Sequence, residues 1–448
     1  MSPLPSSPPP LFVDLTTAFQ ERGRIAHGTV RVERELVGAL AERAIAGRDD
    51  LRFCRFDPAA HRFVAVTAEE ALAVARAATE PERRRTLRPA WRSHPLLQLG
   101  RRLERFVRTE IRDRFRRRRR AVVAAVAPIA GAAEIFPAGA WLLLPGELQR
   151  QDFAYLIALR RRLGLRLATV FYDLLGTLPP GDPRIDDPDA ADIPSSEFIL
   201  RHAALVLSIS QFSADTLAAH AAQRGMAMPP LSVIRLGHRL GPPEPDLPPV
   251  DGLPSGGYVL TVGDVTGRKN HRLLTDIWGT LARARAGRVP PLVIAGRIGR
   301  DGAPLVAAVT ADRDAAPVVR FLSNVDDRQL RWLYANCRFT VFPSISEGFG
   351  LPVVESQALG KACLASTATA IPEASQGAAL HLDPTDVAAW RRAIETLLDD
   401  DAALARAEAT IAEKFRLVGW DDTAADVLAA TDAARAADPS QAVVRPAP

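Results

Sequence analysis

The stretch FTVFPSISEGFGLPVVESQALGKACLAS, residues 339–366, decides the fold that we expect for this chain. Four strand-like residues are followed by a loop that contains Gly348 and Gly350, and an apolar helical pattern begins at Pro352. Proline suits the first position of a helix, because its missing N–H would be unpaired there. The glycines allow a ligand to approach the backbone closely, and the free N–H groups at a helix start attract an anion. The stretch therefore predicts a strand–loop–helix corner that binds a phosphate group.

Two acids lie in this corner, Glu347 in the loop and Glu355 about one turn into the helix. Acids beside a phosphate site suit a ligand that carries both phosphate and hydroxyl groups, such as a nucleotide sugar. The spacing Glu, seven residues, Glu, with GFGLP between the acids, resembles the signature of the family 4 glycosyltransferases, which are retaining enzymes of the GT-B architecture. The alternative is an ordinary strand–loop–helix corner with two solvated glutamates.

The resemblance implies a role for each residue of the corner. Glu355 would hold the ribose hydroxyls of the donor, and Glu347 would lie near the hydroxyls of its sugar. Backbone N–H groups would meet the sugar and the phosphates along the loop, at Gly348, Phe349, Gly350 and Leu351.

A second motif, GDVTGRKN at residues 263–270, follows the first strand of the second half. Ligands of open α/β sheets bind outside the carboxyl ends of the strands, so Arg268 and Lys269 are expected to face a cleft. These cations can neutralise a pyrophosphate leaving group without a metal. The Arg-Lys-Asn triplet resembles the mannosyltransferase-like branch of family 4. Asp264 stands where many members have an arginine, which implies that Arg268 takes over that task. A polar surface turn is the alternative.

Other candidate residues depend more strongly on the resemblance. Tyr172 ends an apolar strand pattern at the place where the family often has a histidine near the transferred sugar; a phenol can hydrogen-bond to a sugar but cannot act as a base near neutral pH. Gly28 precedes a helical run and resembles a glycine beside the phosphates or the acceptor. The resemblance places the nucleotide base near Asn324 and Val325, where Ser323 replaces the usual glycine.

The 448 residues suffice for two or three domains, and strands alternate with helices on both sides of a proline-rich segment. This pattern predicts the α/β class, and the resemblance implies the GT-B fold, with two Rossmann-like domains facing each other across a cleft. The expected organisation is a disordered leader at 1–10, an acceptor domain at 11–240 with a basic insertion at 83–120, a linker at 241–256, a nucleotide-sugar domain at 257–436 whose last helix crosses back, and a loose tail at 437–448.

The net charge of +5 is unevenly distributed, because residues 83–120 hold sixteen arginines against three acids. One local patch explains the basicity, which argues against nucleic acid binding as the main function. Leucines and phenylalanines recur among these arginines at roughly helical spacing, and such basic amphipathic helices often lie on anionic membrane surfaces. A solvated helix or a disordered arm is the alternative. The first ten residues lack the pattern of a signal peptide, and the three cysteines lack metal-binding spacing. We expect a cytoplasmic protein, peripheral at the inner face of the membrane.

The expected activity follows from the resemblance. It implies a metal-independent, cofactor-free retaining hexosyltransferase that moves a hexose from a nucleotide diphosphate sugar to a glycan or lipid-linked acceptor in surface polysaccharide synthesis. GDP-mannose is the first donor implied and dTDP-rhamnose the second. One alternative is a nucleotide-sugar epimerase or hydrolase on the same architecture. Another is a membrane-associated binding subunit with a decayed active site. Tyr172 and Asp264 favour this alternative. The intact set of Glu347, Glu355, Arg268 and Lys269 argues against it.

Overall fold

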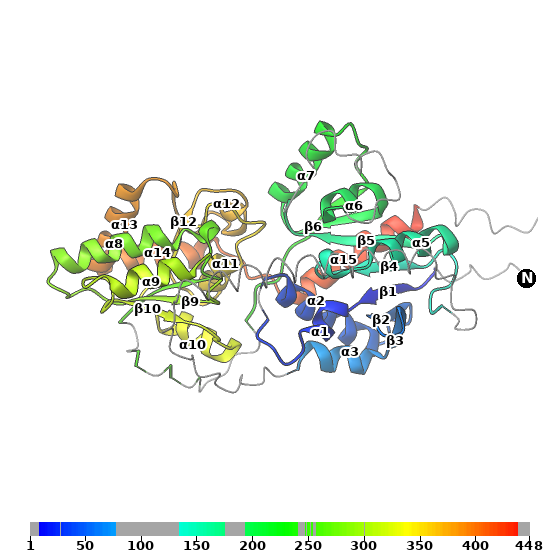
Figure 1. Cartoon of the computed structure of the whole chain (residues 1–448), viewed down its shortest axis with the longest axis horizontal. Coiled ribbons are helices and arrows are strands. Elements are labelled where there is room, and N and C mark those ends of the chain that lie inside the picture. Colours follow the sequence, from blue (N-terminus) through cyan, green and yellow to red (C-terminus); the bar gives the residue numbers. More distant parts are fainter. Residues whose placement is uncertain are drawn as a thin grey trace, which may run out of the picture. The chain divides into compact units, whose positions relative to one another are not determined.

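The computed structural model describes residues 9–26, 28–77, 134–174, 193–240, 247, 249–250, 252–253, 257–299 and 301–437. The basic segment at 83–120, most of the predicted leader and linker, and the tail from residue 438 lie outside the described residues. The strands form two separate sheets of seven and six strands, shown with their helices in Figure 1. We call the first sheet with its covering helices the N-terminal domain and the second the C-terminal domain.

The N-terminal sheet has the strand order β3-β2-β1-β4-β5-β6-β7. All neighbouring strands are parallel except the β2–β3 pair. β1 and β4 are buried along their whole length, as expected for parallel strands that are covered on both faces. The strands are β1 (Leu11–Asp14), β2 (Leu51–Asp57), β3 (Arg62–Val66), β4 (Trp141–Leu144), β5 (Arg166–Phe171), β6 (Ala203–Ser208) and β7 (Leu231–Val233).

The helices of this domain begin at polar caps in several places. Asp152 accepts a hydrogen bond from the N–H of Tyr155 at the start of α5, and Ser210 accepts one from Ser213 at the start of α7. Gly28 precedes α2 with a φ of +50°, a conformation that favours glycine. The helices are α1 (Thr16–Gln20), α2 (Thr29–Ile45), α3 (Ala68–Ala75), α5 (Phe153–Leu163), α6 (Ser195–His202), α7 (Gln211–Gln223) and the 3₁₀ turn η1 (Leu148–Arg150).

The C-terminal sheet is entirely parallel and has the order β10-β9-β8-β11-β12-β13. The direction of strand order reverses between β8 and β11, and open α/β sheets bind ligands at this switch point. Both predicted motifs follow these two strands. The strands are β8 (Val259–Val262), β9 (Leu292–Ala295), β10 (Val319–Leu322), β11 (Thr340–Phe342), β12 (Cys363–Ser366) and β13 (Leu380–Leu382).

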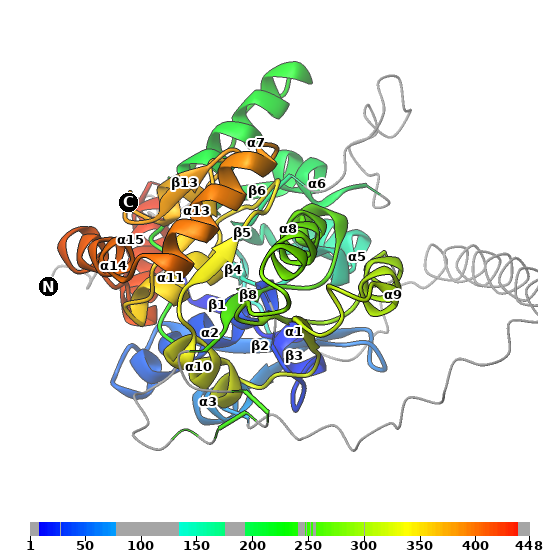
Figure 2. The ribbon, with the colours of Figure 1, turned by 90° about the vertical axis from the view of Figure 1, so that its left-hand side faces the viewer.

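Helices cover both faces of the C-terminal sheet (Figure 2). α8, α9 and α13 pack in the core of one face, and α10 and α11 pack on the other. The helical elements after β8 are η3 (Gly267–Lys269), α8 (His271–Ala284), α9 (Ala303–Ala311), α10 (Asp327–Asn336), α11 (Leu351–Ala358), α12 (Ile371–Ala374), α13 (Val387–Asp399), α14 (Asp401–Lys414) and α15 (Trp420–Ala436).

The start predicted for α11 was wrong by one residue. The helix begins at Leu351, and Pro352 is its second residue. Gly350 is the N-cap with a φ of +112°, so the chain enters the helix through a conformation that favours glycine. Proline is tolerated there, because the first four N–H groups of a helix have no partner within it.

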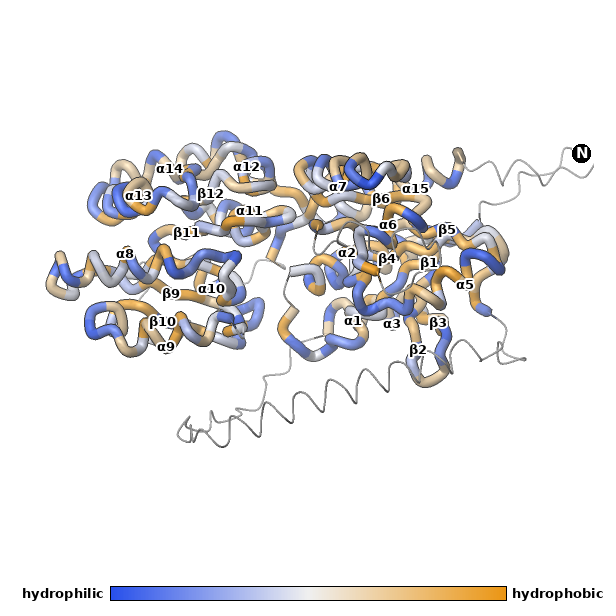
Figure 3. Tube along the Cα trace, turned by 45° about the horizontal axis from the view of Figure 1, so that its top comes forward, coloured by the Kyte–Doolittle hydropathy of each residue, from blue (hydrophilic) through white to orange (hydrophobic). Residues whose placement is uncertain are grey.

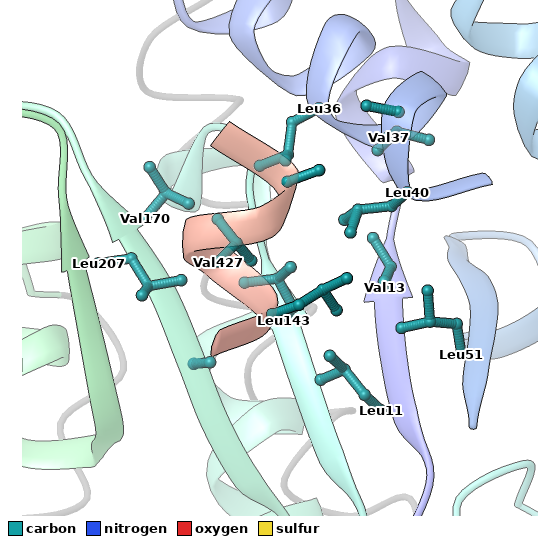
Figure 4. Close-up of a cluster of buried hydrophobic side chains, with 14 of the residues drawn as sticks. Leu11, Val13, Leu36, Val37, Leu40, Leu51, Leu143, Val170, Leu207 and Val427 are labelled. Carbon is teal, nitrogen blue, oxygen red and sulfur yellow. The ribbon is translucent and has the colours of Figure 1, made fainter. Parts of the chain in front are cut away.

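The last helix, α15, packs in the core of the N-terminal domain. Figure 4 shows Val427 of α15 among Leu36 of α2 and Leu143 of β4, and all three side chains are fully buried. A fully buried valine or leucine contributes about 1.5–3 kcal/mol. The backbone at Gly237 lies so close to Trp420 that a Cβ atom there would lie 2.6 Å from the indole ring. The helix therefore forms part of the N-terminal core although it follows the C-terminal domain in sequence.

Hydrophobic residues concentrate in the strands and on the inner faces of the helices (Figure 3). All three cysteines are free and buried. None of the described helices is both long and apolar enough to span a bilayer.

Candidate donor and acceptor cavity

A cavity of about 720 Å³ is lined by residues of both domains. Its walls come largely from the loops that follow β1, β4, β5, β8, β9, β10 and β11, which is where parallel sheets bind ligands. Every residue that the sequence singled out for the site lines this cavity: Gly28, Tyr172, Arg268, Lys269, Asn324, Val325, Glu347, Gly348, Phe349, Gly350, Leu351 and Glu355.

Glu347 joins the two motifs that the sequence analysis treated separately. Its Oε1 accepts a hydrogen bond of 2.6 Å from Lys269 Nζ, and its Oε2 lies 2.8 Å from Arg268 Nη1. The hydroxyl of Ser344 donates a further bond of 2.5 Å to Oε1. The N–H of Ile345 donates to the carbonyl oxygen of Arg268 at 2.9 Å, which ties the loop after β11 to the turn after β8. A carboxylate therefore fixes both cations at the switch point.

The charges in this cluster are differently exposed to solvent. The Lys269 side chain is 12% exposed and that of Arg268 is 42% exposed, so solvent screens the lysine less. Burial disfavours the charged form of Glu347, but Lys269 and Arg268 hold the pKa of this carboxyl below its usual value. Lys269 Nζ also lies 4.9 Å from the centre of the Phe342 ring, a further attraction for the ammonium. One anion between two cations leaves this cluster with a net positive charge.

Gly348 is where the signature loop meets the N-terminal domain. A Cβ atom at this position would lie 2.1 Å from the carbonyl oxygen of Tyr172. The hydroxyls of Ser210 and Ser213 donate to the carbonyl of Gly348 at 2.8 and 3.1 Å. The need for glycine at 348 thus arises from a close approach of two backbones, whereas the sequence analysis attributed it to the approach of a ligand.

Glu355 is almost fully buried in α11 and is bonded to a residue that the sequence analysis did not single out. Arg31 Nη1 donates to its Oε1 at 2.7 Å, and the hydroxyl of Tyr334 donates to its Oε2 at 2.9 Å. Arg31 Nη2 also contacts Asp327 Oδ1 at 2.6 Å. Arg31 lies in α2 of the N-terminal domain, and no local pattern in the sequence connects it with Glu355.

The N-terminal wall of the cavity carries Tyr172 and Asp173. The Tyr172 hydroxyl donates to the carbonyl of Pro145. Burial raises the pKa of Tyr172 well above its usual value, and the nearby acids Glu33 and Glu147 raise it further. The phenol therefore keeps its proton, and its oxygen can accept a hydrogen bond from a sugar hydroxyl but cannot abstract that hydroxyl's proton. Burial also raises the pKa of Asp173, an effect that the positive charge of Arg268 opposes.

Comparison with known proteins decides the nature of the C-terminal domain. Residues 256–400 match the family described as Glycosyl transferases group 1. The C-terminal domain is a group 1 glycosyl transferase domain. The O-antigen chain mannosyltransferase B of Escherichia coli is 32% identical over 166 residues, which are 37% of this chain and 43% of that protein. The O-antigen chain mannosyltransferase RfbU of Salmonella typhimurium is 33% identical over 88 residues, 20% of this chain and 25% of that protein. The chain thus spans less than half the length of these curated relatives.

Two solved structures resemble nearly the whole chain. The sucrose-phosphate synthase of Thermosynechococcus elongatus has a TM-score of 0.57 at 17% identity, with 96% of this chain and 100% of that chain covered. Anabaena HepE in complex with UDP-glucose has a TM-score of 0.55 at 16% identity, with coverages of 94% and 99%. The predicted GT-B fold is confirmed, and so is the resemblance to the mannosyltransferase-like branch of family 4.

The glycosyl transferase domain also presents a cation to the cavity that the sequence analysis missed. Arg297 follows β9, and its Nη2 lies 2.6 Å from Asp264 Oδ2. Both residues line the cavity. Asp264 thus stands beside an arginine that comes from the neighbouring strand. A single arginine after a strand has no distinguishing pattern in an arginine-rich sequence, so this pairing was not predictable. Among the described residues, no group of three or more His, Cys, Asp or Glu side chains could hold a metal ion.

Proposed function

We propose that this protein is a retaining hexosyltransferase that moves a hexose from a nucleoside diphosphate sugar to a hydroxyl of a glycan or lipid-linked acceptor. One observation carries the proposal: Lys269 and Arg268 share the carboxylate of Glu347 at the switch point of the C-terminal sheet, beside the start of α11. Cations, a helix N-terminus and a carboxylate in one cavity suit a ligand with phosphates at one end and hydroxyls at the other.

The donor is assigned to the C-terminal wall of the cavity. The pyrophosphate would lie against Arg268, Lys269 and the backbone N–H groups of the loop that leads into α11. The ribose hydroxyls would donate to Glu355, and the base would lie near Asn324 and Val325. The transferred sugar would then extend toward Glu347 and the N-terminal wall. The acceptor would approach from the side of Tyr172.

The reaction exchanges one bond at the anomeric carbon for another. The bond to the phosphate oxygen breaks, a bond to the acceptor oxygen forms on the same face, and the acceptor proton passes to the departing phosphate oxygen. The diphosphate becomes more negative as its bond breaks, so cations fixed beforehand stabilise the transition state more than the bound donor. Lys269 and Arg268 are proposed to supply this charge in place of a metal ion.

The identity of the donor is proposed from the relatives. Two of them are mannosyltransferases by name, which favours GDP-mannose, and dTDP-rhamnose is the second choice. HepE was solved in complex with UDP-glucose, so UDP-glucose is a third donor to test. We further propose that the protein acts in surface polysaccharide synthesis in the cytoplasm, with residues 83–120 on an anionic membrane surface.

A donor panel tests the proposal. Purified protein is incubated in EDTA with GDP-mannose, dTDP-rhamnose or UDP-glucose and with free and lipid-linked glycan acceptors, and products are identified by mass spectrometry. We expect transfer of a single hexose from one donor. Release of free hexose without transfer would indicate a hydrolase, and a change of the donor sugar would indicate an epimerase. Activity that requires added magnesium or manganese would contradict the role of the two cations.

A further inference from the structure

Arg31 connects the N-terminal domain to the acid that is proposed to bind ribose. It is the third residue of α2, its side chain is 11% exposed, and it lines the cavity. Its guanidinium contacts two helices of the glycosyl transferase domain at once, Glu355 of α11 at 2.7 Å and Asp327 of α10 at 2.6 Å. Burial opposes the charge on this guanidinium, but Glu355 and Asp327 together raise the pKa of Arg31 above its usual value. Arg31 is therefore a fixed cation.

The hydrogen bonds to Glu355 leave one acceptor site open on each of its two carboxylate oxygens. Among the described residues, Arg31 bonds to Oε1 and the Tyr334 hydroxyl bonds to Oε2. An ionised carboxylate has about four lone-pair sites, two on each oxygen. One lone pair thus remains on each oxygen, and two adjacent hydroxyl groups can each donate to one of them. A carboxylate that turned about its bond would lose this arrangement.

We propose that Arg31 is a positioning residue of the donor site, which acts through Glu355 and makes the site specific for ribonucleoside diphosphates over 2′-deoxyribonucleoside diphosphates. Arg31 holds the Glu355 side chain in one orientation, so that its two oxygens accept hydrogen bonds from the 2′- and 3′-hydroxyls of the ribose. This inference rests on the proposed function, since it takes Glu355 as the ribose ligand. It favours GDP-mannose over dTDP-rhamnose as donor, because dTDP lacks the 2′-hydroxyl.

The physical basis of the discrimination is the buried lone pair that a deoxyribose leaves without a partner. Glu355 is 3% exposed, so water reaches it poorly. A site built to bind a hydroxyl group rejects the analogue that lacks it, because its own polar group is then unpaired. A hydrogen bond to a charged group corresponds to about 10- to 100-fold in affinity. Loss of Arg31 lets the Glu355 carboxylate turn, and the preference for ribose should then disappear together with part of the affinity.

The test measures equilibrium binding of GDP, UDP and their 2′-deoxy forms by calorimetry, which needs neither an acceptor nor turnover. We expect the wild type to bind the ribo form about 10- to 100-fold more tightly than the deoxy form. Arg31→Gln should weaken the ribo form by a similar factor and bring the ratio of the two affinities close to one. Arg31→Lys keeps the charge and should retain part of the ratio. The double variant Arg31→Gln/Glu355→Gln should match Glu355→Gln alone, because the first residue acts through the second.

Arg235→Gln is the matched control. Arg235 makes a two-pronged contact with Asp426, at 2.8 Å from Nε and 2.7 Å from Nη2, and it does not line the cavity. This variant should bind both forms as the wild type does. A folded Arg31→Gln protein that kept the wild-type ratio would overturn the inference, and so would a wild type that does not distinguish ribose from deoxyribose. Failure of the wild type to bind any nucleoside diphosphate would instead overturn the proposed function, and the inference with it.

Discussion

Replacement of Lys269 by methionine removes the ammonium and keeps most of the side-chain stem. Lys269 Nζ lies 2.6 Å from Glu347 Oε1, and its side chain is 12% exposed. The Lys269 ammonium and a unit negative charge on the diphosphate about 4 Å away would attract each other by about 4 kcal/mol at an effective dielectric constant of about 20. Removal of one preorganised donor to developing charge costs about 3–4 kcal/mol, or about 10²–10³ in rate. We therefore expect Lys269→Met to lower kcat by about 10²- to 10³-fold, with a smaller change in donor KM.

The assay determines kcat and KM for the preferred donor, with a single-turnover measurement to separate chemistry from product release. Thermal unfolding of the variant is measured as well, because Lys269→Met removes one of the two charged partners of the buried Glu347 and leaves Arg268 as the other. Lys269→Arg keeps a positive charge and should retain more of the rate than Lys269→Met. Lys414→Met is the control, because Lys414 is exposed at the end of α14. It should leave both constants unchanged.

A folded Lys269→Met protein with wild-type kcat would refute the assignment of Lys269 to the pyrophosphate. A raised KM with unchanged kcat would show that the lysine binds the donor and the transition state equally, which also contradicts the reasoning. Arg268 would then be the next cation to replace.

Three further predictions concern other parts of the chain. Gly348→Ala should destabilise the protein by about 1–3 kcal/mol, because its Cβ would lie 2.1 Å from the carbonyl oxygen of Tyr172. Gly267→Ala is the control and should not destabilise the protein, because no atom lies within 4 Å of the added Cβ. Equal melting temperatures for both variants would contradict this contact. Burial raises the pKa of Glu33 well above its usual value, so its contribution to stability is present at low pH and is lost as pH rises. Glu33→Gln should therefore raise the melting temperature more at pH 8 than at pH 5, and an equal shift at both values would count against the raised pKa. Deletion of residues 83–120 should abolish sedimentation with anionic vesicles, and unchanged sedimentation would remove the proposed membrane role.

The sequence predicted the parts of the site that are local in the chain. The corner around Glu347 and Glu355 and the turn with Arg268 and Lys269 each fit within a few residues of one strand end, so spacing and glycine positions sufficed to find them. Their positions on neighbouring strands of one parallel sheet bring them together. The start of α11 was missed by one residue, because the conformation of Gly350 rather than the proline decides where the helix begins.

The parts that could not be predicted are contacts between distant segments. Arg31 and Glu355 are 324 positions apart, and Arg31 lies in a helical run with other charged residues. The contact between Gly348 and the Tyr172 carbonyl likewise depends on how two domains meet, which no local pattern encodes. The basic segment at 83–120 lies outside the described residues, so its role stays a prediction from sequence.

The proposed transfer of a hexose from a nucleoside diphosphate to an acceptor, with retention of configuration, determines what happens at the anomeric carbon of the donor. The most direct measurement follows a donor labelled with ¹³C at the anomeric carbon by NMR, in the presence of acceptor. We predict that the donor signal is replaced by a glycoside signal of the same anomeric configuration, and that Lys269→Met slows this change by about 10²- to 10³-fold. A glycoside of inverted configuration, or a label that ends only in free hexose, would contradict this proposal.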